Sequence, residues 1–151
     1  MLRLSKKTLF AIEAVVDIAY HAGGQPVQSR EITERQGIPR RYLEQALQHL
    51  VRAKILTGVR GPKGGYNLAK ERRRITVGEI VRVVRNMEAA EDPLATDNGS
   101  DIAQEVVRPL WSELQDEMMD KLDGLTVEEL CQRADAAGIV SEGRRNIDFT
   151  I

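Results

Sequence analysis

Cysteine, aromatic residues and long apolar runs are all scarce in this 151-residue chain. The single cysteine, Cys131, excludes an internal framework of disulfide bonds. Aromatic residues make up 4% of the chain, so aliphatic side chains must fill the core. No apolar run approaches about 18 residues, the length that spans a bilayer, and Met1 to Lys7 are not followed by the apolar segment of a signal peptide. We therefore expect a cytoplasmic protein that does not enter a membrane.

The formal net charge of −1 hides a strong asymmetry along the chain. Residues 1–85 contain 17 Lys and Arg against 7 Asp and Glu, a balance of +10, whereas residues 86–151 contain 5 against 16, a balance of −11. A basic half indicates a polyanionic partner. Charge alone does not distinguish DNA, RNA and an anionic membrane, and two solvated surfaces of different charge would give the same counts.

The spacing of apolar residues predicts three helices in the basic half. The first runs from Ser5, as N-cap, to about His21, with Leu9 among the residues of its apolar stripe. A short second helix runs from Ser29, as N-cap, to Gln36, and Gly37 can end it in the left-handed conformation. The third runs from Pro39 to about Ala53, because proline suits the first helical position. Two helices joined by a short Gly-Ile-Pro turn are typical of a helix-turn-helix unit.

A β-hairpin is predicted directly behind the third helix. Residues 55–60 form the first strand, Gly61 to Gly65 the turn and residues 66–69 the returning strand. A basic hairpin in this position is typical of a wing, with Arg60 and Lys63 near its tip. Arg72, Arg73 and Arg74 at its base are either DNA contacts or an exposed turn. A capping box from Thr76 to Glu79 opens a further helix that extends to about Arg85.

The acidic half predicts a linker followed by helices. Residues 86–100 have the composition of a loop, and a helical stripe at spacing four follows from Ile102 to Leu122. Pro109 must lie near the start of this helix or bend it. Thr126 to Glu129 forms a second capping box, which opens a last helix ending near Gly138.

These elements together predict a mainly α protein with a small β-hairpin. We expect a winged helix-turn-helix domain over residues 1–85, a linker over 86–100, a helical dimerisation region over 101–138 and a C-terminal tail over 139–151. Two isolated histidines make no metal site, and no nucleophile or phosphate-loop pattern is present. We therefore do not expect an enzyme.

Three motifs together resemble one bacterial regulator family. They are Tyr-Leu-Glu-Gln at 42–45, Val-Arg-Gly-Pro-Lys-Gly-Gly-Tyr at 59–66 and Ile-Thr-Val-Gly-Glu-Ile at 75–80. The family is that of the iron–sulfur cluster regulator, the nitric-oxide-sensing repressor and the cysteine metabolism repressor (IscR/NsrR/CymR type). The likeness extends from about Arg3 to Val84 and resumes near Leu110 and Trp111, which in the family belong to a long dimerisation helix.

The resemblance implies a homodimer that binds double-stranded DNA, with recognition helices in successive major grooves and wings in the flanking minor grooves. The pattern and the resemblance together give a candidate DNA-binding set of Lys6, Lys7, Arg40, Arg41, Tyr42, Glu44, Gln45, Arg60 and Lys63. The candidate dimerisation set is Val107, Leu110, Trp111, Leu114, Met118 and Leu122.

The sequence departs from the family at the iron–sulfur site. Cluster-binding members carry three cysteines between the wing domain and the long helix, whereas residues 86–111 contain none. Glu105 and Arg108 stand nearest the positions of the last cysteine and an associated histidine ligand. One thiol cannot hold a cluster in a monomer. Cys131 is either a small buried hydrophobe or a ligand shared between subunits, and we expect no cofactor.

The last residues suggest a partner. Asp148, Phe149, Thr150 and Ile151 resemble the tail by which serine acetyltransferase docks into the active site of cysteine synthase (O-acetylserine sulfhydrylase). The cysteine metabolism repressor is also a cluster-free family member that works through that enzyme. The alternative is a frayed tail that has no partner and ends on isoleucine by chance.

The sequence thus predicts a dimeric, sequence-specific transcriptional regulator, a repressor of cysteine or sulfur genes gated by cysteine synthase. The alternative is a protein-interaction module that binds cysteine synthase and has only weak or architectural DNA binding.

Overall fold

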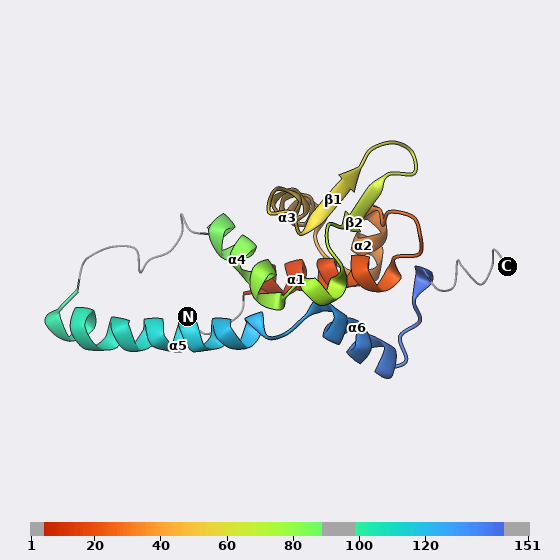
Figure 1. Ribbon diagram of the computed structural model, residues 1–151. Coiled ribbons are helices and arrows are strands. Elements are labelled where there is room, and N and C mark those ends of the chain that lie inside the picture. The colour runs from red at the N-terminus through yellow and green to blue at the C-terminus, as the bar shows by residue number, and fades with distance from the viewer. Residues whose placement is uncertain (1–4, 89–98, 144–151) are drawn as a thin grey trace.

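The computed structural model describes residues 5–88 and 99–143 (Figure 1). Its helices are α1 (Lys6–His21), α2 (Ser29–Gln36), α3 (Arg40–Arg52), α4 (Val77–Glu88), α5 (Arg108–Asp123) and α6 (Val127–Ala136). The strands are β1 (Leu56–Val59) and β2 (Gly65–Leu68), with a 3-10 turn η1 (Arg72–Arg74) and a π-helical turn η4 (Ala103–Val107). This confirms a mainly α fold with a small hairpin. No helix in the described ranges is long and apolar enough to cross a membrane.

Helix α1 lies at the centre of the body, where it contacts α2, α3, α4, α6 and β2. Ser5 caps its N-terminus as predicted, and the Ser5 hydroxyl accepts a hydrogen bond from the backbone N–H of Thr8 at 3.2 Å. Leu9 was expected to face the core but is 43% exposed. Because neighbours pack on several sides of α1, its buried surface is made largely of small side chains, namely Ala11, Ala14, Val15, Ile18 and Ala19.

The helix-turn-helix unit is formed by α2 and α3. Gly37 ends α2 in the left-handed conformation, with φ 66°, as predicted. Two helix starts differ from the prediction by one residue. The N-cap of α2 is Gln28 rather than Ser29, because the Glu31 carboxylate accepts a hydrogen bond from the Gln28 backbone N–H at 2.8 Å. Pro39 is the N-cap of α3 rather than its first helical residue.

The hairpin is antiparallel, and its pairing runs from Leu56 with Leu68 to Val59 with Gly65. Val27, which precedes α2, extends the hairpin through two backbone hydrogen bonds with Tyr66, at 3.0 and 2.8 Å. A Cβ atom on Gly65 would lie 2.5 Å from the Val27 carbonyl oxygen, so only glycine permits this approach. The returning strand of the wing is therefore fastened to the body close to the turn.

The two predicted capping boxes are present. Glu79 N–H donates to the Thr76 hydroxyl at 3.2 Å, and Glu129 N–H donates to the Thr126 hydroxyl at 3.2 Å. Pro109 is the second residue of α5 and follows the π-helical turn η4, which runs into α5 without a break. Helix α6 packs into the same core as α1, where its Val127 and Cys131 are buried.

Helix α4 continues to Glu88, beyond its predicted end near Arg85. Residues 89–98 of the predicted linker lie outside the described residues, as do residues 144–151. The candidate partner-binding residues Asp148, Phe149, Thr150 and Ile151 fall in the second of these ranges.

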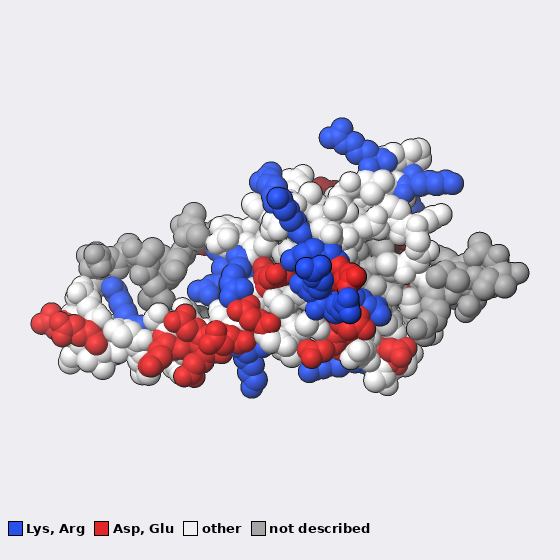
Figure 2. Space-filling model, viewed as in Figure 1, with Lys and Arg blue, Asp and Glu red and all other residues white. Residues whose placement is uncertain are grey.

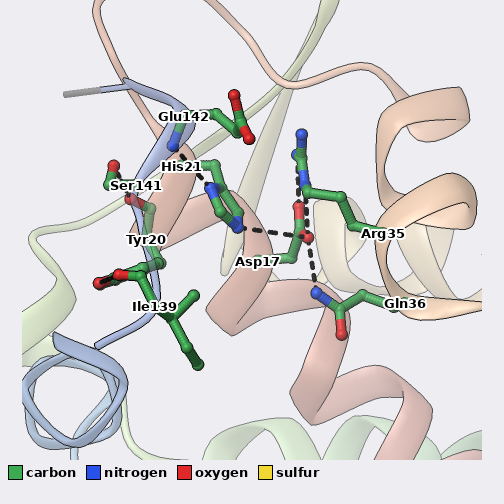
Figure 3. Close-up of polar contacts among 8 residues, drawn as sticks. All are labelled: Asp17, Tyr20, His21, Arg35, Gln36, Ile139, Ser141 and Glu142. Atoms are coloured by element: carbon green, nitrogen blue, oxygen red, sulfur yellow. Dashed lines mark hydrogen bonds and ion pairs between the residues drawn. The ribbon is translucent and has the colours of Figure 1, made fainter. Parts of the chain in front are cut away.

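A buried carboxylate, Asp17, joins α1 to the end of α2 (Figure 3). Arg35 donates to it from Nε and Nη2 at 2.9 and 2.8 Å, and Gln36 Nε2 donates at 2.8 Å. The Asp17 side chain is 0% exposed, against 23% for Arg35. Three donors, two of them on a charged guanidinium, offset the cost of taking this carboxylate out of water. The contact fixes the last turn of α2, directly before the chain enters α3.

The segment after α6 closes over the end of α1 (Figure 3). The Tyr20 hydroxyl donates to the Ile139 carbonyl, and the Ser141 hydroxyl donates to the Tyr20 carbonyl at 2.7 Å. The His21 ring accepts at Nδ1 from the backbone N–H of Glu142 at 3.0 Å. Burial lowers the pKa of His21 and outweighs the attraction of Asp17, which favours the neutral ring that this hydrogen bond needs.

Removal of the Asp17 carboxylate leaves the Arg35 guanidinium partly buried without its partner. We expect Asp17→Ala to lower the free energy of unfolding by about 3 kcal/mol, measured by urea denaturation. The matched control is Glu34→Ala, which removes a 70%-exposed carboxylate from an ion pair with Arg30. That loss should stay below about 0.5 kcal/mol. Equal effects of the two substitutions would contradict the importance of the buried pair.

Candidate nucleic-acid interface

Helix α3 presents a polar face to solvent because its apolar stripe is fully used in the core. Leu43, Ala46, Leu47 and Leu50 are buried. The side chains on the opposite face are exposed, namely Arg40, Arg41, Glu44, Gln45 and Gln48. Within that face Arg40 Nε donates to Glu44 Oε1 at 3.1 Å. Side chains of these types hydrogen-bond to phosphates and to the edges of bases.

Tyr42, one of the candidate DNA-binding residues, has a half-buried ring. The ring lies 5.9 Å from that of Phe10, and its hydroxyl donates to the Lys7 carbonyl at 2.6 Å. Burial, helped by the negative charge of Glu88, raises the pKa of Tyr42 to about 12. Tyr42 therefore fastens the start of α1 to α3 rather than standing free at the surface.

This contact places two lysines of the candidate set beside the polar face of α3. Lys6 and Lys7 are exposed in the first turn of α1. Lys7, Tyr42 and Gln45 line one small pocket of about 210 Å³. The structure thus brings the basic start of α1 next to the polar face of α3.

The wing supplies the other basic side chains. Arg60 and Lys63 are exposed at its tip. A groove of about 620 Å³ separates the wing from the start of α2. Gln28 Nε2 reaches across to the Pro62 carbonyl at 3.4 Å, which helps to set the direction of the tip. In Figure 1 the hairpin and α3 lie on one side of the body, and α5 and α6 lie on the other.

Ion pairing separates the basic residues into two groups. Lys70, Arg72 and Arg73, at the base of the wing, pair with Glu79, Glu128 and Glu71 respectively. Among the described residues, Arg41, Arg60 and Lys63 have no acidic partner, although they are exposed. Three of the positive charges at the base of the wing are therefore neutralised, whereas charge is left available on α3 and the wing tip. The pairing of Arg72 and Arg73 favours the exposed-turn interpretation for these two residues.

Figure 2 shows the same separation on one face of the molecule. Lysine and arginine side chains project from the side that carries the hairpin, whereas aspartate and glutamate side chains gather along α5. A phosphate backbone would meet attraction on the first side and repulsion on the second.

Sequence reasoning missed three contributors to this surface. Arg52, the last residue of α3, and Lys54, which precedes β1, are exposed, and Lys54 adopts a left-handed conformation with φ 62° that turns the chain into the wing. Gln28 orients the wing tip. A signal for the first two existed, since they extend the basic composition of the third helix. No local pattern indicates a contact between Gln28 and a residue 34 positions away.

The candidate dimerisation residues lie along η4 and α5. Val107 and Leu110 are 52% and 53% exposed, and nearby Ile102 and Val106 are 69% and 59% exposed. The other four candidates are half-buried or partly exposed, namely Trp111, Leu114, Met118 and Leu122. Near the end of α5, Met119 is buried against Val77 and Val81 of α4. One end of α5 is thus packed on the body, and the other presents apolar side chains to water.

The sequence offers one cysteine as a thiolate donor for an iron–sulfur cluster. Cys131 is the only cysteine in the sequence, and it is 2% exposed in the core. Burial raises the pKa of its thiol, and the nearby Arg72 offsets only part of that effect. Glu105 lies in η4, before α5, whereas Cys131 lies on α6, after it (Figure 1). Within residues 5–88 and 99–143 no group of three or more His, Cys, Asp or Glu is arranged to hold a metal ion. These residues do not fit a cluster.

Comparison with known proteins identifies a family of transcriptional regulators. Residues 4–133 match the Rrf2 family model, described as "Iron-dependent Transcriptional regulator". The HTH-type transcriptional regulator IscR of Pectobacterium atrosepticum is 32% identical over 138 residues, which cover 91% of this chain and 84% of that protein.

Two solved structures are similar over most of their length. T. potens IscR superposes with a TM-score of 0.71 at 32% identity, covering 93% of each chain. CymR, the global cysteine regulator of B. subtilis, superposes with a TM-score of 0.69 at 28% identity, covering 88% of this chain and 98% of that one.

The unpaired cations of the wing tip should contact phosphates. We expect the double variant Arg60→Ala/Lys63→Ala to weaken binding to all duplexes and to lower the salt slope by about 1 for each phosphate that the protein no longer neutralises. Fluorescence anisotropy at several salt concentrations measures both quantities. Arg73→Ala is the matched control, since Arg73 is already paired with Glu71 at 2.6 Å. A slope that the double variant leaves at the wild-type value would refute the wing contacts.

Proposed function

Because the chain belongs to the Rrf2 family of transcriptional regulators, we propose that it acts as a homodimer that recognises a two-fold operator without an iron–sulfur cluster. That it is a DNA-binding transcriptional regulator, and not an enzyme, follows from the family. The observation that carries the dimer is the exposed apolar surface of η4 and α5, where Ile102 is 69% exposed and Leu110 is 53% exposed. Contiguous apolar surface of this kind marks an interaction site.

A second copy of the chain is the occupant that best fits this surface. The apolar residues follow a helical stripe from Ile102 through Val106 to Leu110, which is the pattern of helices that pack side by side. The acidic residues of α5 make the surface a poor match for DNA. A two-fold axis along this stripe would present two copies of α3 and of the wing to one duplex.

Sequence recognition is assigned to α3 and general affinity to the basic residues around it. Arg41, Glu44 and Gln45 are exposed on the face of α3 that would enter a major groove. The Glu44 carboxylate, oriented by Arg40 at 3.1 Å, would accept from a cytosine amino group. A specific site should then bind about 10³ to 10⁷ times more tightly than random DNA. Equal affinity for all sequences would favour the alternative, an interaction module with architectural DNA binding.

The cluster-free state is supported by the chemistry of the donors. Iron–sulfur clusters are held by cysteine thiolates, and the chain has one cysteine, buried in the core. Because the chain has one cysteine, we do not extend the iron dependence named in the family description to this protein.

Repression of cysteine or sulfur genes has narrower support. It comes from the structural similarity to the global cysteine regulator of B. subtilis and from the resemblance of the sequence motifs to that family. A dimer of this size that occupies a promoter would block the polymerase, which is the simplest route to repression. Docking of Asp148, Phe149, Thr150 and Ile151 on cysteine synthase stays a prediction from the sequence.

Charged residues in the apolar stripe should separate the subunits. We expect Val106→Glu/Leu110→Glu to sediment as a monomer with unchanged helix content, because paired carboxylates cannot be buried in an apolar interface. Its specific DNA affinity should fall, and the salt slope should drop by about half because one subunit contacts half of the phosphates.

The matched control for this test is Val140→Glu, which places the same charge on a 65%-exposed valine outside α5. It should sediment like the wild-type protein. A wild-type monomer, or a double variant that stays dimeric, would contradict the proposed interface.

A further inference from the structure

The end of α5 is joined to α4 by a paired contact between Arg82 and Asp123. Arg82 Nη1 donates to Asp123 Oδ1 at 2.7 Å, and Nη2 donates to Oδ2 at 2.6 Å. Two parallel hydrogen bonds of this kind fix the relative orientation of both groups, which a single contact does not. These hydrogen bonds hold the pKa of Asp123 below its usual range, so the carboxylate stays charged.

Gly78 makes room for this contact. A Cβ atom at Gly78 would overlap Asp123 Oδ1 and would lie 3.1 Å from the backbone nitrogen of Asp123. The end of α5 therefore lies directly against the first turn of α4, and a larger residue at Gly78 must displace the Asp123 carboxylate and press on its backbone.

Backbone hydrogen bonds also join the start of α4 to the segment that follows α5. Val77 N–H donates to the Leu125 carbonyl at 2.8 Å, and Val127 N–H donates to the Ile75 carbonyl at 2.9 Å. Met119 is 7% exposed and packs on α4 beside these bonds. We call Gly78, Arg82 and Asp123 the α4–α5 joint.

The other end of α5 extends beyond the body, as Figure 1 shows. Its 16 residues span about 24 Å at about 1.5 Å per residue. A rotation of about 10° at the joint would move the far end by about 4 Å, which exceeds the rise of about 3.4 Å per base pair. A rotation of this size at the joint would therefore move the far end of α5 by more than the rise of one base pair.

We propose that the α4–α5 joint sets the angle between the dimerisation helix and the recognition helix, and so determines which half-site spacing the dimer accepts. Arg82 and Asp123 act as positioning residues and make no contact with DNA. This inference rests on the proposed dimer, since a monomer has no spacing to select.

The test begins with selection of operators by the wild-type protein from randomised duplexes, which gives its preferred spacing. Affinity is then measured for duplexes in which the two half-sites are moved by one or two base pairs in either direction. We expect the preference of the wild-type protein for its own spacing to fall about tenfold or more in Arg82→Ala, Asp123→Asn and Gly78→Ala. Affinity for an isolated half-site should not change.

Two further variants separate positioning from general damage. The exchange Arg82→Asp/Asp123→Arg rebuilds the pair and should restore much of the spacing preference. Lys70→Ala is the control, because it removes an ion pair to Glu79 of α4, at 3.3 Å, that is about as exposed as the Arg82–Asp123 pair but does not involve α5. This substitution should leave the spacing preference unchanged.

Sedimentation of each protein distinguishes the two ways in which the inference can fail. Variants that are dimeric and keep the full spacing preference would overturn the role of the joint and leave the dimer intact. A wild-type protein that binds its operator as a monomer would overturn the proposed function itself.

Discussion

The buried carboxylate of Asp17 is the constraint on which the arrangement of the DNA-binding face depends. It lies on the central helix and takes hydrogen bonds from Arg35 and Gln36, so it fixes the last turn of α2. Gly37 then turns the chain, and α3 follows from Arg40 with its direction already set. The same end of α1 carries His21, which accepts from the segment after α6. One charged group in the core thereby orders the recognition helix.

The fold neutralises some of the basic side chains by ion pairs and leaves others unpaired, and this distribution of charge determines which surface can bind a polyanion. Acidic residues beside η1 and on α4 and α6 pair with the base of the wing, while Arg41, Arg60 and Lys63 keep their charge for a polyanion. The acidic α5 lies away from that surface and offers apolar side chains instead (Figures 1 and 2). The charge asymmetry of the sequence thus becomes a division between a basic side, on which we propose that DNA binds, and an acidic helix on which we propose that a second copy packs.

Local signals explain what the sequence could predict. Ser5, the Thr76–Glu79 box and the Thr126–Glu129 box act within one helical turn, so the helix starts they predict are correct. Contacts between distant segments leave no such signal. Tyr42 was expected only as a candidate DNA-binding residue, and nothing near it in the sequence indicates that its hydroxyl donates to the Lys7 carbonyl, 35 residues away. Arg82 and Asp123 are 41 residues apart, and nothing around either residue indicates its partner.

The family is described as iron-dependent, yet the chain has only Cys131, buried in the core, to offer a cluster. The central claim is that α3, the wing and the α5 dimer recognise DNA without that cofactor. Its most direct test is the operator affinity of protein purified without oxygen, measured with and without an iron chelator and alongside its iron content. We predict an iron-free, colourless dimer whose affinity the chelator does not change. Bound iron with a cluster absorption band, and loss of operator binding on chelation, would contradict the claim.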